Sequence, residues 1–189
     1  MKTLTKSFFN RPTEQVAKDL LGCYLISKSA NGKTIGKIVE TEAYLFNDKA
    51  SHSFNGQTKR NSPMFSHPGT IYIYFTYGMY HCFNIVTREK GVGEAVLIRA
   101  LEPLEGLELM KKRRSTDNIK NLCSGPAKLV LAMDISKSLN NTLINKSSLK
   151  ISQKDSVPEI VTSKRVGIIK GANLPLRFYI KNNPYVSRV

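Results

Sequence analysis

The stretch IYIYFTYGMYHCFNIV, residues 71–86, gives the strongest indication of the fold. Tyr, Ile, Phe and Val fill both halves of it, and Tyr77-Gly78 separates the halves, which is the pattern of two strands joined by a tight turn. We therefore predict a hairpin of strands 71–75 and 80–86. Gly78 can adopt the positive φ that such a turn often needs.

Further strands and helices flank this hairpin along the chain. The sequence predicts strands at 23–27, 35–41, 95–101, 165–169 and 176–180, and helices at 12–21, 103–114 and 124–133, the last with Ser124 as a cap. Two polar segments, 47–68 and 136–154, are predicted to be a long loop and a surface excursion. The helices are segregated from the hairpins, which favours an α+β fold over a parallel sheet. The length of 189 residues predicts one domain, 1–189.

The charge balance indicates the class of partner. Lys and Arg number 29 against 14 Asp and Glu, so the formal net charge is +15. Such a charge attracts polyanions at long range and is typical of nucleic-acid-binding proteins, although a basic surface that only aids solubility is the alternative. The sequence has no long basic amphipathic helix and no apolar stretch of membrane-spanning length, which disfavours a membrane partner. Residues 1–12 lack the apolar core of a signal peptide, so we expect a cytoplasmic protein.

The cysteines and histidines do not indicate a metal or a disulfide framework. Cys23, Cys82 and Cys123 are odd in number and far apart, and they are interpreted as small core residues. The three histidines lack the spacing of metal ligands. The P-loop, GxGxxG and GxSxG motifs are all missing, so we expect neither metal nor cofactor.

Two features could carry chemistry. In IVETEAY, residues 38–44, strand alternation places Glu40, Glu42 and Tyr44 on one face at the mouth of the polar loop. A carboxylate there can act as a general base, and a solvent-facing strand edge is the alternative. The second feature is the row of tyrosines in the hairpin, because aromatic platforms in a basic protein suit stacking on unpaired bases. Ordinary strand propensity explains much of this row but not Tyr77 at the tip, where a ring could enter a DNA stack.

Motifs along nearly the whole chain resemble the alkyladenine (3-methyladenine) DNA glycosylase family. In family order they are VETEAY (39–44), SHS (51–53), RN (60–61), MF (64–65), PG (68–69), YIY (72–74), YGMY (77–80), Asn84, LIRALEPLEG (97–106), SGPAKL (124–129), RVG (165–167) and PLRFY (175–179). The resemblance implies a compact single domain with a curved, mostly antiparallel sheet, peripheral helices and a protruding hairpin that inserts into DNA. It also implies a monomer without metal.

The resemblance also implies roles for individual residues. Glu42, rather than Glu40, is expected to be the general base, so replacing Glu40 by Gln should be far milder, and Arg99 is expected to help hold the water and the backbone. The flipped purine is expected to lie in a pocket formed by Tyr44, His52, Tyr74 and Asn84, with Asn84 at the purine 2-position. Tyr77 is expected to insert into the duplex. Arg60 and Lys128 are expected to contact the DNA backbone. A pocket shared by Tyr74 and Asn84 requires an odd-length hairpin loop or a β-bulge, because otherwise the two side chains point to opposite faces.

The expected mechanism begins with extrusion of the damaged nucleotide, since a base inside the duplex hides its glycosidic bond. A carboxylate can stabilise the oxocarbenium-like sugar and deprotonate water. The expected substrates are 3-methyladenine and 7-methylguanine, whose positive charge makes them good leaving groups, with hypoxanthine and ethenoadenine as further candidates. Two alternatives are a non-catalytic nucleic-acid-binding module, which leaves Glu42 without a role, and a glycosylase with lyase activity through a lysine Schiff base.

Overall fold

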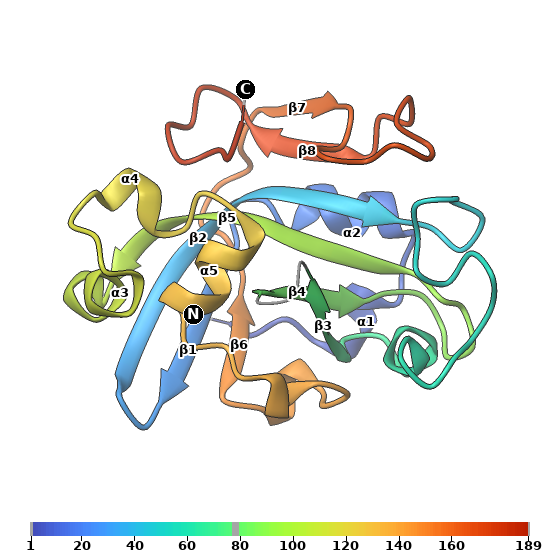
Figure 1. The fold of residues 1–189 in the computed structure, drawn as a ribbon, viewed down its shortest axis with the longest axis horizontal. Helices are drawn as coiled ribbons and strands as arrows, with labels where there is room; N and C mark the ends of the chain where they lie inside the picture. Colours follow the sequence, from blue (N-terminus) through green and yellow to red (C-terminus); the bar gives the residue numbers. More distant parts are fainter. Residues whose placement is uncertain (1, 77–79, 189) are drawn as a thin grey trace.

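The computed structural model describes residues 2–76 and 80–188 and has an α+β architecture (Figure 1). The strands are β1 (Tyr24–Ser29), β2 (Gly32–Tyr44), β3 (Ile71–Thr76), β4 (Tyr80–Val86), β5 (Ala95–Glu105), β6 (Leu149–Ser152), β7 (Ile160–Ser163) and β8 (Arg177–Ile180). The α-helices are α1 (Lys6–Phe9), α2 (Thr13–Asp19), α3 (Leu107–Arg114), α4 (Ile119–Leu122) and α5 (Pro126–Ala132), and the 3₁₀ helices are η1 (Ser62–Phe65), η2 (Lys137–Leu139) and η3 (Ile144–Lys146).

All eight strands belong to one antiparallel sheet that divides at β2. The order β3-β4-β5-β2-β1-β6 runs through the sheet, and β8 pairs with residues 40–42 of β2, beyond the end of β1. β7 then extends the sheet from β8, so this pair lies apart from β1 and β6 (Figure 1). The 13 residues of β2 therefore connect both branches, and the second branch covers the part of β2 that carries the two glutamates.

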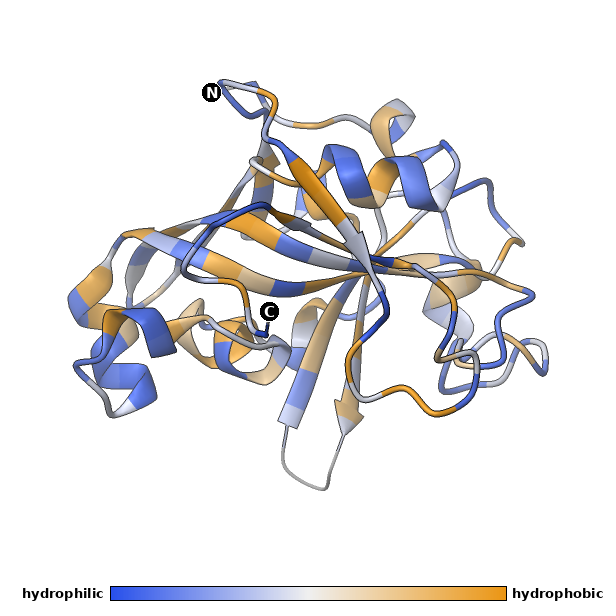
Figure 2. Ribbon diagram, turned by 90° about the horizontal axis from the view of Figure 1, so that it is seen from above, coloured by the Kyte–Doolittle hydropathy of each residue, from blue (hydrophilic) through white to orange (hydrophobic). Residues whose placement is uncertain are grey.

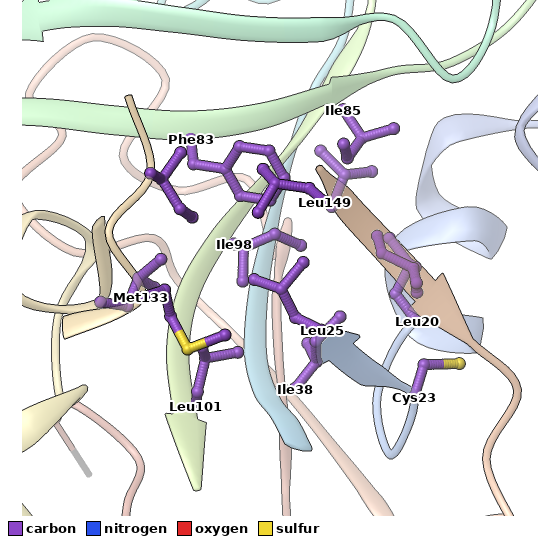
Figure 3. Close-up of a cluster of buried hydrophobic side chains, with 14 of the residues drawn as sticks. Leu20, Cys23, Leu25, Ile38, Phe83, Ile85, Ile98, Leu101, Met133 and Leu149 are labelled. Carbon is purple, nitrogen blue, oxygen red and sulfur yellow. The ribbon is translucent and has the colours of Figure 1, made fainter. Parts of the chain in front are cut away.

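The hydrophobic core joins the sheet to the helices. Buried side chains from β1, β2, β4, β5 and β6 meet Leu20, at the end of α2, and Met133, after α5 (Figure 3). Figure 2 shows hydrophobic and hydrophilic residues alternating along the long strands, as expected where the two faces of a sheet differ. Burying each aliphatic side chain of this kind stabilises the fold by about 1.5–3 kcal/mol.

The two faces of β2 bury different chemistry. Ala43 belongs to the hydrophobic core, and the Thr41 hydroxyl donates a 2.9 Å hydrogen bond to the carbonyl oxygen of Ala17 in α2. The opposite face carries Glu40 and Glu42, which are also fully buried. The solvent-facing strand edge considered from the sequence is therefore wrong for both glutamates.

Most predicted elements are present, with shifted ends. The hairpin strands agree almost residue for residue, since β3 is one residue longer than predicted and β4 matches, and the three cysteines are buried. β2 and β5 extend beyond their predicted ranges, and α2 is shorter than 12–21. Within the described ranges, 2–76 and 80–188, no helix has the length and apolar character needed to cross a membrane, and no cluster of three His, Cys, Asp or Glu side chains could hold a metal ion.

Two helix predictions are wrong at their N-terminal ends. The predicted helix 103–114 begins only at Leu107, because 103–105 pair with β2 as the end of β5, and Gly106, with φ of +78°, turns the chain between the two elements. Leu104, in this end of β5, is 44% exposed. The helix predicted at 124–133 is capped by Gly125, and the Ser124 hydroxyl instead contacts Asn121 Oδ1 at 3.4 Å.

Two predictions in the last third of the chain are also wrong. The segment 136–154 is not only a surface excursion, because β6 pairs with β1 and buries Leu149 and Ile151. The predicted strand 165–169 does not form, and β7 lies earlier in the chain. Gly167 has φ of +73°, outside the extended range of a strand, and the Val166 amide bonds a side chain instead of a neighbouring strand.

Candidate active site

A cavity of about 100 Å³ lies beside the hairpin. Its lining comes from β2, β3, β4, β5, η1, the loop after β2 and the connection between β7 and β8, and consists of Tyr44, Ala50, His52, Met64, Tyr72, Tyr74, Asn84, Ala95 and Ile168. All four residues predicted for the pocket, Tyr44, His52, Tyr74 and Asn84, are among them. None of these nine lining residues is a lysine, so the cavity gives no support to Schiff-base chemistry.

The hairpin register explains how Tyr74 and Asn84 share this cavity. Asn84 lies opposite Tyr72, and Thr76 lies opposite Tyr80, so an odd number of residues separates the last paired positions. Because paired residues point to the same face, Asn84 and Tyr74 are on one face, as predicted. The Asn84 amide donates to the Tyr72 carbonyl oxygen at 3.1 Å, which fixes its side chain. The prediction for Tyr77 concerns a position outside the described residues.

Neutral aromatic side chains form much of the wall. The His52 ring meets the Tyr74 ring edge-on at 4.5 Å, and His52 Nδ1 is hydrogen-bonded to the Tyr72 hydroxyl at 2.9 Å. Burial and the charge of Arg60 lower the pKa of His52, so its imidazole is neutral near pH 7. Burial raises the pKa of Tyr72 to about 12. The wall therefore carries polar groups without net charge.

Tyr44 connects the cavity to Glu42. Its ring lines the cavity, and its hydroxyl donates a 2.9 Å hydrogen bond to Glu42 Oε2. Burial, followed by the negative charge of Glu42, raises the pKa of Tyr44, so the hydroxyl keeps its proton. The guanidinium of Arg165 lies over the Tyr44 ring, 4.7 Å from its centroid, and helps to hold the ring in place.

Both oxygens of the Glu42 carboxylate have partners. Besides the Tyr44 hydroxyl, Glu42 Oε1 accepts a 2.9 Å hydrogen bond from the Val166 amide and lies 3.4 Å from Arg99 Nη1. Burial disfavours the charged form of Arg99, but Glu42 and Glu40 raise its pKa above the ordinary value. Buried charges persist where they are paired in this way, and the two hydrogen bonds and the ion pair hold both carboxylate oxygens in position.

Glu40, which the resemblance implies is not the general base, lies in the same cluster. Its carboxylate accepts hydrogen bonds from Arg99 Nε at 3.1 Å and from Arg177 Nε at 2.7 Å. The backbone amide and the hydroxyl of Ser187 also donate to it, at 2.7 Å and 3.0 Å. Replacing Glu40 would leave two buried guanidinium groups underpaired, so it is unsuitable as a mild control.

A second buried ion pair holds the segment that carries Val166 and Ile168. Arg165 binds both carboxylate oxygens of Asp48, with Nη2 to Oδ1 at 3.0 Å, and its Nη1 donates to the Ala43 carbonyl oxygen at 3.0 Å. Both side chains are almost fully buried. The sequence analysis missed Asp48 and the Val166 amide, although the RVG motif lies in this segment.

The two predicted contacts with the DNA backbone differ in their position. Arg60 is exposed, and its Nη2 lies 3.5 Å from the carbonyl oxygen of Phe75 on β3, close to the cavity. Lys128 lies on α5, where its ammonium group binds Asn121 and the Ser124 hydroxyl. The structure therefore places Arg60 beside the hairpin and ties Lys128 to the segment before its own helix.

Known proteins resemble this chain over nearly all of its length. The model of a family described as methylpurine-DNA glycosylase matches residues 7–184. Proteins named "Putative 3-methyladenine DNA glycosylase" are 51% identical over 181 residues in Francisella tularensis (93% of this chain and 94% of that protein) and 50% identical over 191 residues in Methanoculleus marisnigri (98% and 99%). One from Carboxydothermus hydrogenoformans is 50% identical over 188 residues, 98% of each chain.

Proposed function

The chain belongs to the methylpurine-DNA glycosylase family, and we propose that it removes alkylated or deaminated purines from duplex DNA with a water molecule activated by Glu42. 3-Methyladenine and 7-methylguanine are the proposed main substrates, with hypoxanthine and ethenoadenine as further candidates. The observation that carries the proposal is a fully buried carboxylate bonded to Tyr44, which itself lines a neutral aromatic cavity. A non-catalytic binding module would have no use for this arrangement.

The cavity suits a flipped, cationic purine. A base must leave the duplex before its glycosidic bond can be reached. The faces of Tyr44 and Tyr74 then offer stacking surfaces, and a positively charged ring is attracted to such faces. The lowered pKa of His52 matters here, because a neutral imidazole does not repel a cationic base. Asn84 is proposed to inspect the 2-position of the purine.

The proposed reaction needs one carboxylate. The bond between sugar C1′ and the purine nitrogen breaks, its electron pair leaves with the base, and an alkylated cationic purine departs neutral. Water oxygen bonds to C1′ while Glu42 accepts a proton from that water and stabilises the oxocarbenium-like sugar. Arg99 and the Val166 amide hold the carboxylate in place. Neutral hypoxanthine needs protonation at N7, so its release should be slower.

The remaining part of the proposal concerns DNA binding. The net charge of +15 supplies the long-range attraction to phosphates, and Arg60 lies near the cavity as a candidate phosphate contact. Tyr77 is proposed to fill the gap left by the flipped nucleotide, and Lys128 to contact the backbone. We propose that the chain acts as a single domain and as a monomer. Its proposed location is the cytoplasm, because the DNA of a bacterial-type cell lies there.

The experiment is a comparison of base release from four duplexes. The duplexes carry 3-methyladenine, 7-methylguanine, inosine or no damage, and free bases are quantified after incubation with the full chain. We expect release of both methylated purines, slower release of hypoxanthine and none from undamaged DNA. Borohydride should trap no covalent complex with the abasic product. An absence of release from all three damaged duplexes would refute the proposed function.

A further inference from the structure

The Arg99 guanidinium is held by a different group at each of its three nitrogens. Nε lies 3.1 Å from Glu40 Oε1, Nη2 lies 3.3 Å from the Ser187 hydroxyl, and Nη1 lies 3.4 Å from Glu42 Oε1. A guanidinium is a rigid planar fork, so fixing two nitrogens determines where the third one points. Glu40 and Ser187 therefore determine how Nη1 meets Glu42.

Glu40 and Ser187 also bind each other. The Ser187 amide and hydroxyl donate to the two oxygens of Glu40, at 2.7 Å and 3.0 Å. Arg177 Nε donates to Glu40 Oε1 at 2.7 Å, and Arg177 Nη1 donates to the Ser163 hydroxyl at 3.2 Å. Ser187 lies in the segment after β8, so contacts distant from the cavity reach Glu42 through a single guanidinium.

We propose that Glu40 and Ser187 are positioning residues for the glycosylase reaction, acting through Arg99 to hold the Glu42 carboxylate in its productive orientation. The inference rests on the proposed role of Glu42 as general base. Stability alone does not account for such a cluster, because buried ion pairs are often no more stabilising than packed apolar side chains. Misplacement of a reacting group by about 1 Å can reduce a rate about 10²-fold, which is the scale on which this positioning acts.

The first test compares two serines at opposite ends of the cluster. Ser187→Ala removes a hydroxyl that contacts both Glu40 and Arg99. Ser163→Ala removes a hydroxyl that contacts Arg177 but neither Glu40 nor Arg99. Ser187→Ala loses the bonds of one hydroxyl to two charged groups. Because these bonds act on Glu42 only through Arg99, we expect the single-turnover excision rate to fall about 3- to 10-fold, less than after loss of a bond made to Glu42 itself. Affinity for damaged DNA should stay at the wild-type value. The matched control, Ser163→Ala, should keep the wild-type rate within about twofold.

The second test is a double-mutant cycle between Glu40 and Arg99. Glu40→Gln should lower the single-turnover rate about 10²-fold with little change in DNA affinity. If Glu40 acts only through Arg99, adding Glu40→Gln to Arg99→Ala should lower the rate by less than about twofold. If the double variant instead shows the product of the two single-variant decreases in excision rate, the inference is overturned. Should Glu40→Gln fail to fold, the serine comparison decides alone, since each serine change removes only one hydroxyl.

Glu42→Gln, measured in the same assay, separates this inference from the proposed function. If Glu42→Gln is inactive while both serine variants keep the wild-type excision rate, the positioning role is refuted and the proposed function stands. Equal slowing of excision by the two serine variants would also refute the positioning role, because the cluster would then serve stability only. If Glu42→Gln retains the wild-type rate, the proposed mechanism is wrong and the positioning role falls with it.

Discussion

Two regions beside the cavity differ in how they treat their functional groups. We call them the buried wall, which holds the charged cluster around Glu42, and the hairpin wall, which is the exposed end of β3 and β4. On the buried wall, Glu42 and Arg99 are almost completely enclosed and bonded to donors or acceptors. On the hairpin wall, formed by β3 and β4, Phe75 and Tyr80 are 47% and 40% exposed. Enclosed charges need fixed partners and so keep a fixed geometry, whereas exposed rings are available to another molecule. We therefore expect chemistry on the buried wall and DNA binding on the hairpin wall.

The largest effect on the buried wall is expected from removing one member of the buried Asp48–Arg165 ion pair. Asp48→Ala leaves the Arg165 guanidinium buried without its carboxylate, which should lower the free energy of unfolding by about 3–5 kcal/mol. Denaturant titration measures this change. Asp155→Ala is the control, because its carboxylate is exposed and bonded to the Tyr24 hydroxyl, and it should change stability by less than about 0.5 kcal/mol. Equal stability of the two variants would show that the pair does not fasten this wall.

Removing one hydroxyl tests the link between the cavity and the carboxylate. Tyr44→Phe keeps the ring but loses the 2.9 Å hydrogen bond to Glu42. Hydrogen bonds to charged groups contribute about 1.5–3 kcal/mol, so we expect excision to slow roughly 10- to 100-fold under single-turnover conditions. Tyr24→Phe, which removes a surface hydroxyl, should be neutral. A wild-type rate for Tyr44→Phe would mean that this bond does not orient the general base.

The smallest effect is expected on the hairpin wall. Arg60→Ala should weaken DNA affinity a few-fold and reduce the slope of log affinity against log salt by about 0.9, the value for one lost phosphate contact. The rate with saturating enzyme should not change. Affinities of the wild type and the variant at several salt concentrations supply the slope. An unchanged slope would show that Arg60 makes no phosphate contact. A slower chemical step would show that the hairpin wall also takes part in the chemistry.

The predictable parts of the molecule are those with a local sequence pattern. Alternating aromatic and aliphatic residues were enough to predict the extents of β3 and β4. The odd spacing between the strands was instead inferred from the family resemblance, which also supplied the pocket residues that the structure brings together. β6 was missed because Leu149 and Ile151 are its only large apolar side chains within a polar segment. Two residues cannot show the alternation that identifies longer strands.

The contacts of the charged cluster could not be predicted, because they join distant parts of the chain. Arg99 and Arg177 are 59 and 137 positions from Glu40, and Arg165 is 117 positions from Asp48. No local pattern specifies such pairs, and a charged residue is by default expected at the surface. The fold alone brings these side chains together, and the family resemblance, which singled out Glu42, gave no sign of the contacts that Glu40 makes.

The most direct test of the division between the walls is to measure excision and binding with Glu42→Gln on one duplex that carries 7-methylguanine. The amide keeps the shape of the side chain but cannot accept a proton from water, so the single-turnover rate should fall about 10²- to 10⁴-fold. The dissociation constant should stay within about twofold of the wild-type value, since phosphate contacts supply most of the affinity. Glu105→Gln, an exposed glutamate paired with Lys33, serves as the control. A wild-type excision rate for Glu42→Gln, or a loss of binding as large as the loss of rate, would contradict the account.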